Sequence, residues 1–228
     1  MLDVTYKINE IFYSIQGEGP DAGKPAIFVR LSGCNLNCWF CDTNHHSHTI
    51  KSVAEIVQHV MRKGGLRCHF VVLTGGEPFL YDIAPLIKML NTFNYSVQVE
   101  TNGTLWQESC ENLFTGQNTI ICSPKRETVH PKIEERAAAF KYIVGRGTDT
   151  VDGLPTHSVP SREQGVAFTY NMAPMFAPKN IDIEKIYIQP RDDHDAEKNR
   201  ENTTVAASLC LAQNFRLSLQ THKLAGLQ

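Results

Sequence analysis

The sequence predicts an α/β fold built on a parallel sheet. Short apolar runs alternate with stretches of helical periodicity, the order expected for strands joined by right-handed helical crossovers. Glycine and polar residues gather just after several of the apolar runs. The 228 residues, with 42% hydrophobic content, suit one well-buried core. We therefore expect a single domain over residues 1–228.

Each predicted strand is a short run rich in Val, Ile, Phe or Tyr, the residue types enriched in strands. The predicted strands are Ala26 to Leu31, His69 to Leu73, Ser96 to Glu100, Thr119 to Cys122, Phe140 to Val144, Ile186 to Ile188 and Arg216 to Leu219. Such a pattern is typical both of an open sheet and of a closed barrel.

The clearest predicted helix follows Ser52, which forms a capping-box pattern with Glu55. Gly64-Gly65 ends the run. One face of this helix carries Val53, Ile56, Val57, Val60 and Met61. Two further amphipathic patterns predict helices over Ile83 to Leu90 and Asp195 to Ala212. These helices fall between predicted strands, as the crossovers require.

Polar and glycine-rich segments follow the predicted strands at their carboxyl ends. In order they are the cysteine loop beginning at Cys34, Thr74 to Pro78, Thr101 to Gly103, Ser123 to Lys125, Gln189 to Arg191 and Gln220 to Lys223. Parallel strands deliver their following loops to the same edge of the sheet, and that edge carries the active site. The sequence therefore predicts one functional site at this edge.

Composition narrows the class of partner. The formal net charge is −2, and Lys and Arg are scattered, so no basic stripe favours nucleic acid. Met1 to Glu10 lacks a basic segment followed by an apolar one, and no apolar run approaches the roughly 20 residues of a membrane span. We expect a cytoplasmic protein with a small-molecule substrate, no nucleic acid and no membrane.

Three of the seven cysteines lie close together: Cys34, Cys38 and Cys41 read C-x3-C-x2-C. This spacing suits a 4Fe-4S cluster, because three thiolates leave one of four irons free to bind something else. Radical S-adenosylmethionine enzymes use that free iron for their cofactor. The alternative is a zinc site with a fourth ligand from His45, His46 or His48. Cys68, Cys110, Cys122 and Cys210 are isolated and are expected to be buried small apolar residues.

Five segments together resemble the 7-carboxy-7-deazaguanine synthase family of radical S-adenosylmethionine enzymes. They are Ser14 to Gly19, Cys34 to Thr43, Gly75 to Pro78, Glu100 to Gly103 and Leu217 to Lys223. The cysteine triad and Gly-Gly-Glu-Pro occur across the radical superfamily, whereas the first and last segments narrow the resemblance to this family. Nothing in Gly147 to Asp182 matches it.

The resemblance implies a partial, incomplete TIM-like parallel β/α barrel of the radical SAM type. It implies conversion of 6-carboxy-5,6,7,8-tetrahydropterin to 7-carboxy-7-deazaguanine with loss of ammonia, in the biosynthesis of preQ0 and queuosine. The implied cofactors are a 4Fe-4S cluster, S-adenosyl-L-methionine and Mg2+. The implied partners are a reductant protein such as flavodoxin or ferredoxin and a second copy of the chain in a homodimer.

The resemblance also implies site residues, none of them catalytic, because the radical is borne by the cofactor. The metal ligands are Cys34, Cys38 and Cys41 for the cluster and Thr43 for Mg2+. The S-adenosylmethionine site is formed by Phe40, Cys41, Asp42, Gly75, Gly76, Glu77, Gly103, Ser123, Pro124, Lys125 and Gln189. The substrate contacts are Ile15, Gln16, Gly17, Arg30 and Thr101. We expect Glu77 to take the cofactor ammonium and Arg30 to grip the pterin carboxylate with two hydrogen bonds.

Each of these residues has a plainer interpretation. Arg30 is equally consistent with a surface residue at a strand end, Lys125 with a solvated charge, and Asp42-Thr43 with a loop cap. Two other functions stay open: a glycyl-radical-enzyme activating enzyme, whose cysteine spacing is the same, and a zinc-stabilised binding module. The sequence identifies neither the electron donor, nor the dimer interface, nor the role of residues 147–182, nor the final 7-deazapurine of the pathway.

Overall fold

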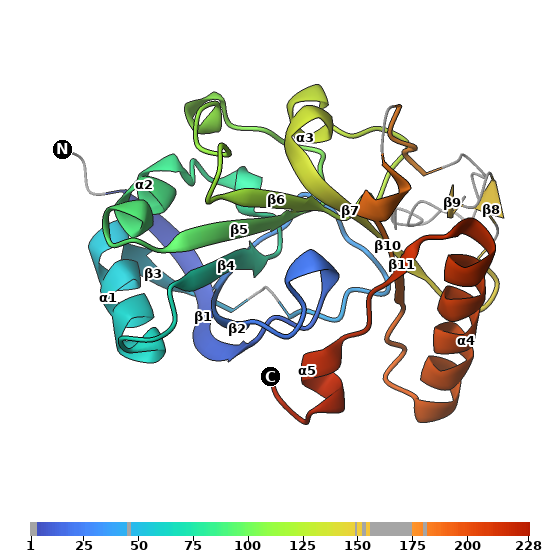
Figure 1. The fold of residues 1–228 in the computed structure, drawn as a ribbon. Helices are drawn as coiled ribbons and strands as arrows, with labels where there is room; N and C mark the ends of the chain where they lie inside the picture. Colours follow the sequence, from blue (N-terminus) through green and yellow to red (C-terminus); the bar gives the residue numbers. More distant parts are fainter. Residues whose placement is uncertain (1–3, 45–46, 149, 152–153, 156–174, 180–181) are drawn as a thin grey trace, which may run out of the picture.

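The computed structural model describes residues 4–44, 47–148, 150–151, 154–155, 175–179 and 182–228. A mixed sheet of nine strands, in the order β11-β10-β7-β6-β5-β4-β2-β1-β3, forms its centre (Figure 1). The strands of this sheet are β1 (Thr5–Ile15), β2 (Pro25–Leu31), β3 (Thr49–Ser52), β4 (Phe70–Gly75), β5 (Ser96–Thr101), β6 (Thr119–Cys122), β7 (Ala137–Val144), β10 (Ile186–Pro190) and β11 (Arg216–Leu217). A separate small hairpin joins β8 (Thr150–Val151) to β9 (Leu154–Pro155).

The seven predicted strands are all present, with ends that differ by a few residues. From β2 to β11 they pair in parallel and lie in chain order, so the winding never reverses. A doubly wound sheet would reverse its order near the middle, whereas a TIM-type barrel keeps one direction. The sheet ends at β3 and β11 without these two strands pairing. The fold is therefore the expected partial β/α barrel.

At one edge, the predicted parallel sheet carries two further strands that are antiparallel to their neighbours. Neither strand was predicted from the sequence: β1 pairs with β2, and β3 pairs with β1 on its other side, both in antiparallel fashion. The turn between β1 and β2 contains Gly19 and Gly23, both with positive φ (66° and 91°), so the chain folds directly back on itself. A parallel neighbour would have needed a helical crossover at this point.

The helices are α1 (Val53–Gly64), α2 (Ala84–Thr92), α3 (Pro131–Arg136), α4 (Ala196–Gln213) and α5 (Thr221–Leu224). The predicted capping box of α1 is confirmed, because Ser52 N donates to Glu55 Oε2 (2.7 Å) and Glu55 N donates to Ser52 Oγ (3.3 Å). The predicted helix from Asp195 begins one residue later, with the Asp195 carboxylate accepting from two backbone amides. Met61, expected on the buried face of α1, is exposed.

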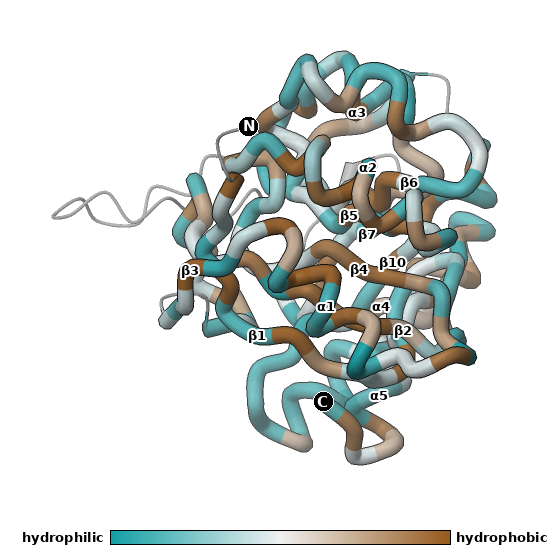
Figure 2. The backbone as a smooth tube through the Cα atoms, turned by 90° about the vertical axis from the view of Figure 1, so that its left-hand side faces the viewer, coloured by the Kyte–Doolittle hydropathy of each residue, from teal (hydrophilic) through white to brown (hydrophobic). Residues whose placement is uncertain are grey.

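The main core lies between the sheet and the helices that follow its strands. Apolar residues of α1 and α2 pack against β1, β2, β4 and β5 in one buried cluster. Figure 2 shows brown, hydrophobic stretches in the middle of the molecule, around β4, while much of the chain near the C-terminus is teal and hydrophilic. In the described part of the chain, no helix combines the length and apolar character that crossing a membrane requires.

Residues 218–228 form a segment, here called the strap, that runs from the β11 edge of the sheet back to β1. At its start, Gly19 N donates to Ser218 Oγ (2.9 Å) and Ser218 N donates to Ile188 O (2.8 Å). At its far end, Ser14 Oγ donates to Gln228 O (2.6 Å). The strap therefore bridges the two sides of the open barrel, with α5 lying below the sheet in Figure 1.

Candidate active site

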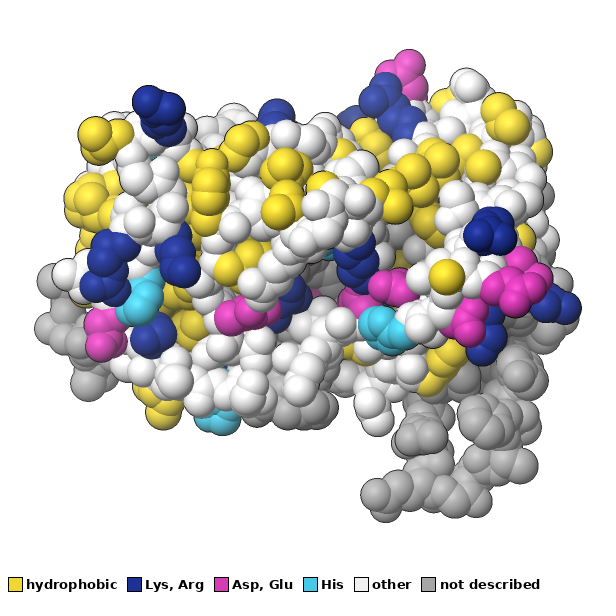
Figure 3. Space-filling model, turned by 90° about the horizontal axis from the view of Figure 1, so that it is seen from below, with side chains coloured by type: hydrophobic (Ala, Val, Ile, Leu, Met, Phe, Trp, Pro, Cys, Tyr) yellow, Lys and Arg dark blue, Asp and Glu magenta, His cyan; other side chains and the backbone are white. Residues whose placement is uncertain are grey.

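A cavity of about 390 Å³ opens at the carboxyl edge of the parallel strands. The segments that follow β2, β4, β5, β6, β10 and β11 all contribute to its wall, together with the turn between β1 and β2. The prediction that polar segments converge at this edge is thus confirmed. Seen from below, charged side chains of both signs lie interspersed in a band across the molecule (Figure 3). No single-sign patch dominates that face.

The thiols of Cys34, Cys38 and Cys41 are free, and all three residues line this cavity. Their loop is irregular from Ser32 to Asn44 and turns where Cys41 N donates to Cys38 O (3.1 Å). Burial raises the pKa of the Cys38 thiol to about 11. At neutral pH that free thiol is protonated, so metal binding has to displace the proton.

The donor set fits a cluster. Among the described residues, no three His, Cys, Asp or Glu side chains converge on a site for a single ion. A cubane does not need such convergence, because each thiolate binds a different iron. Three free thiols from one loop, all lining the same cavity, would hold a cluster and leave one iron without a protein ligand. His45 and His46, the alternative zinc ligands, lie outside the described residues.

Gly75 and Gly76 bring the end of β4 into contact with the start of the cysteine loop. Gly76 N donates to Leu31 O (3.1 Å), and Glu77 N donates to Gly33 O (2.9 Å). A Cβ at Gly76 would lie 1.8 Å from Gly33 O, and Gly75 has a φ of +123°. Only glycines allow this approach, so the pair fixes where the cysteine loop begins.

Glu77 lies fully buried behind the cavity wall. Its carboxylate accepts from Thr101 Oγ1 (2.7 Å), Asn102 N (2.7 Å) and Phe79 N (3.0 Å). Burial raises its pKa to about 7, against the effect of these donors. In this arrangement Glu77 supports the residues that follow β5. Its expected contact with a cofactor ammonium stays a prediction.

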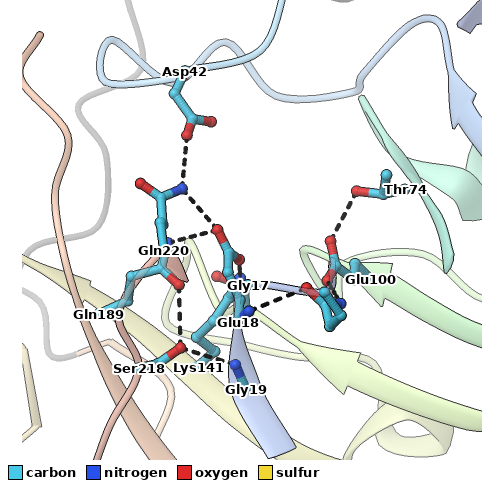
Figure 4. A network of polar contacts seen from close by, with 12 residues as sticks. Gly17, Glu18, Gly19, Asp42, Thr74, Glu100, Lys141, Gln189, Ser218 and Gln220 are labelled. Atoms are coloured by element: carbon cyan, nitrogen blue, oxygen red, sulfur yellow. Dashed lines mark hydrogen bonds and ion pairs between the residues drawn. The ribbon is translucent and has the colours of Figure 1, made fainter. Parts of the chain in front are cut away.

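A largely buried ion pair joins the β1–β2 turn to the sheet: Lys141 Nζ, on β7, contacts Glu18 Oε2 (Figure 4). Burial alone would raise the pKa of Glu18, but the Lys141 ammonium lowers it below its usual range. Gln189 Nε2 (3.2 Å) and Gln220 Nε2 (2.7 Å) also donate to Glu18 Oε1. Gln220 reaches Asp42 Oδ2 as well (3.1 Å), which connects this pair to the cysteine loop.

A second carboxylate, Glu100 at the end of β5, lies on the same wall (Figure 4). Gln16 Nε2 donates to its Oε1 and Thr74 Oγ1 to its Oε2, both at 2.9 Å. These contacts hold the polar end of Gln16, a predicted substrate contact, inside the cavity. Glu18 and Glu100 therefore give this wall two acceptors for ligand N–H groups.

Arg30 lines the cavity but already has partners. Its Nε donates to Glu10 Oε1 (2.8 Å), its Nη1 donates to Thr43 Oγ1 (3.2 Å), and its guanidinium lies over the Phe12 ring. Lys125, on the opposite loop, donates to Ser123 O (2.8 Å), and burial lowers its pKa. Lys125 is thus a half-buried cation that lines the site.

His222 of the strap packs against the backbone of Gly17, where an added Cβ would lie 1.9 Å from His222 Nδ1. Within the described residues, that buried nitrogen has no hydrogen-bond partner. Burial lowers the pKa of His222, so the imidazole is mainly neutral at pH 7. Gly17 itself does not line the cavity and acts as the support on which His222 lies.

Most residues expected at the site line this cavity: Gln16, Arg30, Cys34, Cys38, Phe40, Cys41, Asp42, Thr43, Gly75, Gly76, Thr101, Ser123, Lys125 and Gln189. The expected residues outside its lining are Ile15, Gly17, Glu77, Gly103 and Pro124. Sequence reasoning missed Lys141, Glu18 as an acceptor, and Glu100. The one available signal was a lysine inside the apolar strand Ala137–Val144, since a buried ammonium needs a partner.

Comparison with known proteins identifies the family to which this chain belongs. Residues 28–156 match the model of the Radical SAM superfamily. The 7-carboxy-7-deazaguanine synthase of Rhodospirillum rubrum is 39% identical over 224 residues, covering 95% of this chain and 90% of the relative. The chain belongs to the 7-carboxy-7-deazaguanine synthase family. The Rickettsia prowazekii synthase is 34% identical, covering 97% of this chain and 88% of the relative.

A solved structure agrees with this family. QueE from Escherichia coli has a TM-score of 0.64 and 28% identity, covering 94% of this chain and 93% of its own. Membership makes the chain a radical SAM enzyme of the lyase class that uses a 4Fe-4S cluster and S-adenosylmethionine. It decides against a zinc-stabilised binding module and against a glycyl-radical-enzyme activating enzyme.

Proposed function

We propose that this 7-carboxy-7-deazaguanine synthase acts on 6-carboxy-5,6,7,8-tetrahydropterin and releases ammonia. One observation carries the proposal: the cavity that holds the three thiols also holds Arg30, Glu18 and Glu100 on its other walls. A pterin presents ring and amino N–H groups that suit carboxylate acceptors, and its carboxylate suits a guanidinium. A cavity of about 390 Å³ has the size of a small-ligand site.

When bound, the reduced cluster with S-adenosylmethionine supplies abstraction of a hydrogen atom from a substrate carbon. The chain's own residues hold the cofactor and orient the substrate. Cys34, Cys38 and Cys41 would hold the cluster, while Gly75 and Gly76 fix the backbone at the start of the cysteine loop. Ser123, Lys125 and Gln189 line the remaining wall toward the cofactor. Glu18 and Glu100 orient the pterin, and the strap excludes water from the reacting atoms.

The test is anaerobic reconstitution with iron and sulfide, followed by incubation with S-adenosylmethionine, a chemical reductant and this pterin. Mass spectrometry should detect 7-carboxy-7-deazaguanine, and the ammonia released should equal the product formed. A reaction lacking the reductant serves as the control. A protein that cleaves S-adenosylmethionine but leaves the pterin unchanged would refute the proposed substrate.

We also propose that Thr43 ligates Mg2+ beside the substrate. Its hydroxyl lines the cavity and lies beside the Asp42 carboxylate, with Thr43 Oγ1 to Asp42 Oδ1 at 3.4 Å. Hydroxyl and carboxylate oxygens are ligands that Mg2+ accepts, with water and substrate completing the octahedron. The Arg30 Nη1 contact to Thr43 would have to yield to the ion.

If Thr43 binds Mg2+, adding a chelator of divalent metals should slow turnover and leave the cluster absorbance intact. Thr43→Ala should gain less rate from added Mg2+ than the parent protein does, because one ligand is gone. Rates measured across a Mg2+ titration give the comparison. Identical Mg2+ responses in the two proteins would remove Thr43 from the metal site.

Arg30→Lys should weaken pterin binding far more than it changes cluster content. Lysine keeps the charge but loses the planar group that holds Glu10 and Thr43 while facing the cavity. Loss of a charge-assisted hydrogen bond costs roughly 1.5 to 3 kcal/mol, so the apparent affinity should fall on the order of ten- to a hundredfold. KM for the pterin is the measurement. An unchanged KM would mean that the pterin carboxylate is held by Lys125, Arg191 or His222 instead of Arg30.

We further infer, by analogy with the family, a single radical SAM core domain that works in the cytoplasm as a homodimer. The electron would come from a small reductant protein, flavodoxin or ferredoxin. Light scattering on the reconstituted protein tests the dimer. Replacing the chemical reductant with each carrier in the product assay tests the electron donor.

A further inference from the structure

The cysteine loop has no helix or strand of its own to hold it. From Ser32 to Asn44 the described chain is irregular, and Cys41 at its far end is exposed. Backbone contacts with Gly76 and Glu77 hold the start of the loop at Leu31 and Gly33. The position of the other end, around Cys41, therefore depends on side-chain contacts.

Lys223 of the strap provides one such contact. Its Nζ lies 2.9 Å from Asp42 Oδ2, next to the ligand Cys41, and 2.6 Å from Asp192 Oδ2. Asp192 lies in the segment between β10 and α4. One ammonium thus bridges two carboxylates from different parts of the chain. Without it, Asp42 and Asp192 would face the same space with two negative charges.

The β10–α4 segment is itself firmly held. Asp192 Oδ1 accepts from His194 N (2.9 Å) and Asn199 Nδ2 (2.8 Å). Fully buried Asn202 of α4 donates to Arg191 O (2.9 Å) and to Asp193 Oδ2 (2.8 Å). Asp192 is therefore a fixed anchor on the barrel, while Asp42 belongs to the irregular loop.

Arg191 of the same segment makes a second contact with the cysteine loop. Its Nε and Nη2 donate to the two carboxylate oxygens of Asp193 (2.7 and 2.9 Å). The guanidinium also lies 4.7 Å from the centre of the Trp39 ring. In the sequence, Trp39 lies between the ligands Cys38 and Cys41. These two hydrogen bonds to Asp193 fix the orientation of the guanidinium plane. Trp39 therefore packs against a group whose orientation is held in place.

We propose that Arg191, Asp192 and Lys223 form a clamp that positions the far end of the cysteine loop. The clamp fixes Trp39 and Asp42, and thereby sets where Cys41 presents its thiolate and which way the iron without a protein ligand faces. These are positioning residues that act through the loop. The proposal rests on the cluster-binding role of the three cysteines and needs no particular substrate.

Hydrogen–deuterium exchange on the full chain before reconstitution tests the clamp. In Lys223→Met, amides of residues 35–43 should exchange on the order of tenfold faster, because the bridge is lost and the two carboxylates repel. Lys223→Arg keeps the bridge and should exchange as the parent does. Lys132→Met is the matched control, because it removes a similarly exposed lysine of α3, which pairs with Glu111. Unchanged exchange in Lys223→Met would overturn the clamp.

A double variant separates repulsion from general destabilisation. Adding Asp192→Asn to Lys223→Met removes one of the two facing charges, so exchange over residues 35–43 should slow again toward that of the parent. If the two changes only weakened the fold, the double variant would exchange faster than the single one, and the clamp would be refuted.

The reconstituted protein gives an independent readout. Lys223→Met should keep its iron content yet form on the order of tenfold less product per S-adenosylmethionine cleaved, because the cofactor is bound but misdirected. Parent-like coupling in this variant would also refute the clamp. The exchange experiment uses neither pterin nor cofactor, so a wrong substrate assignment leaves its result unaffected.

Discussion

Cys38→Ala should leave the protein unable to assemble a 4Fe-4S cluster and should abolish product formation. The three cysteines line the same cavity, and two thiolates cannot hold a cubane that leaves one iron open. The same loss is expected for Cys34→Ala and Cys41→Ala. Iron and acid-labile sulfide measured after anaerobic reconstitution report the cluster, and the pterin assay reports turnover.

The matched control is Cys210→Ala. Cys210 is a free, buried cysteine on α4 outside the cavity lining, so its loss should cost some packing energy and leave the iron content unchanged. Full iron content and activity in any of the three cavity variants would show that the cluster ligands have been assigned wrongly.

Gly76→Ala should reduce cluster content and product formation nearly as much as the cysteine variants do. The cause in this case is backbone packing alone. The added methyl group would lie 1.8 Å from Gly33 O and 2.4 Å from Gly33 C, so two backbone segments must separate. Overpacking of this kind costs about 1–3 kcal/mol of stability. Because Gly33 directly precedes the ligand Cys34, we expect low cluster content as well. Thermal unfolding and iron analysis measure the two effects.

Gly64→Ala provides the comparison for that variant. In the last turn of α1, a Cβ at Gly64 would meet the end of a flexible side chain, Ile27 Cδ1, at 2.7 Å. That methyl group can move, and alanine is the better helix former, so stability should stay within about 1 kcal/mol of the parent. Parent-like stability and iron content in Gly76→Ala would mean that the two segments have room to spare.

The sequence predicts the parallel strands and the cavity edge because both depend on local features. Apolar runs identify strands, and parallel topology then sends every following loop to one side. The strand β1 was not predicted from the sequence, because Lys7, Asn9 and Glu10 interrupt its apolar residues. Its burial nevertheless alternates at both ends, from Thr5 to Ile8 and from Phe12 to Ser14, as expected for a half-buried strand.

The parts of the site that could not be predicted depend on distant pairing. Lys141 and Glu18 lie 123 positions apart, and nothing local to either indicates that they meet. The burial of Glu77 is similar, because its donors Thr101 and Asn102 belong to the next strand and its loop. A motif such as Gly-Gly-Glu-Pro fixes which residue types occur, while the packing of the neighbouring strand decides which way the carboxylate points.

The strap has a consequence for the order in which the enzyme is built. Its contact between Ser14 and Gln228 joins residues 214 positions apart, and Thr221 contacts Gly17 across 204 positions. During synthesis from the N-terminus, β1 and the cysteine loop emerge long before these partners do. Contacts of such high sequence separation are the slowest to form, since the loop they close costs the most chain entropy. Because Gln220, His222 and Gln228 of the strap line the cavity, the wall of the site is complete only after the strap has packed against β1.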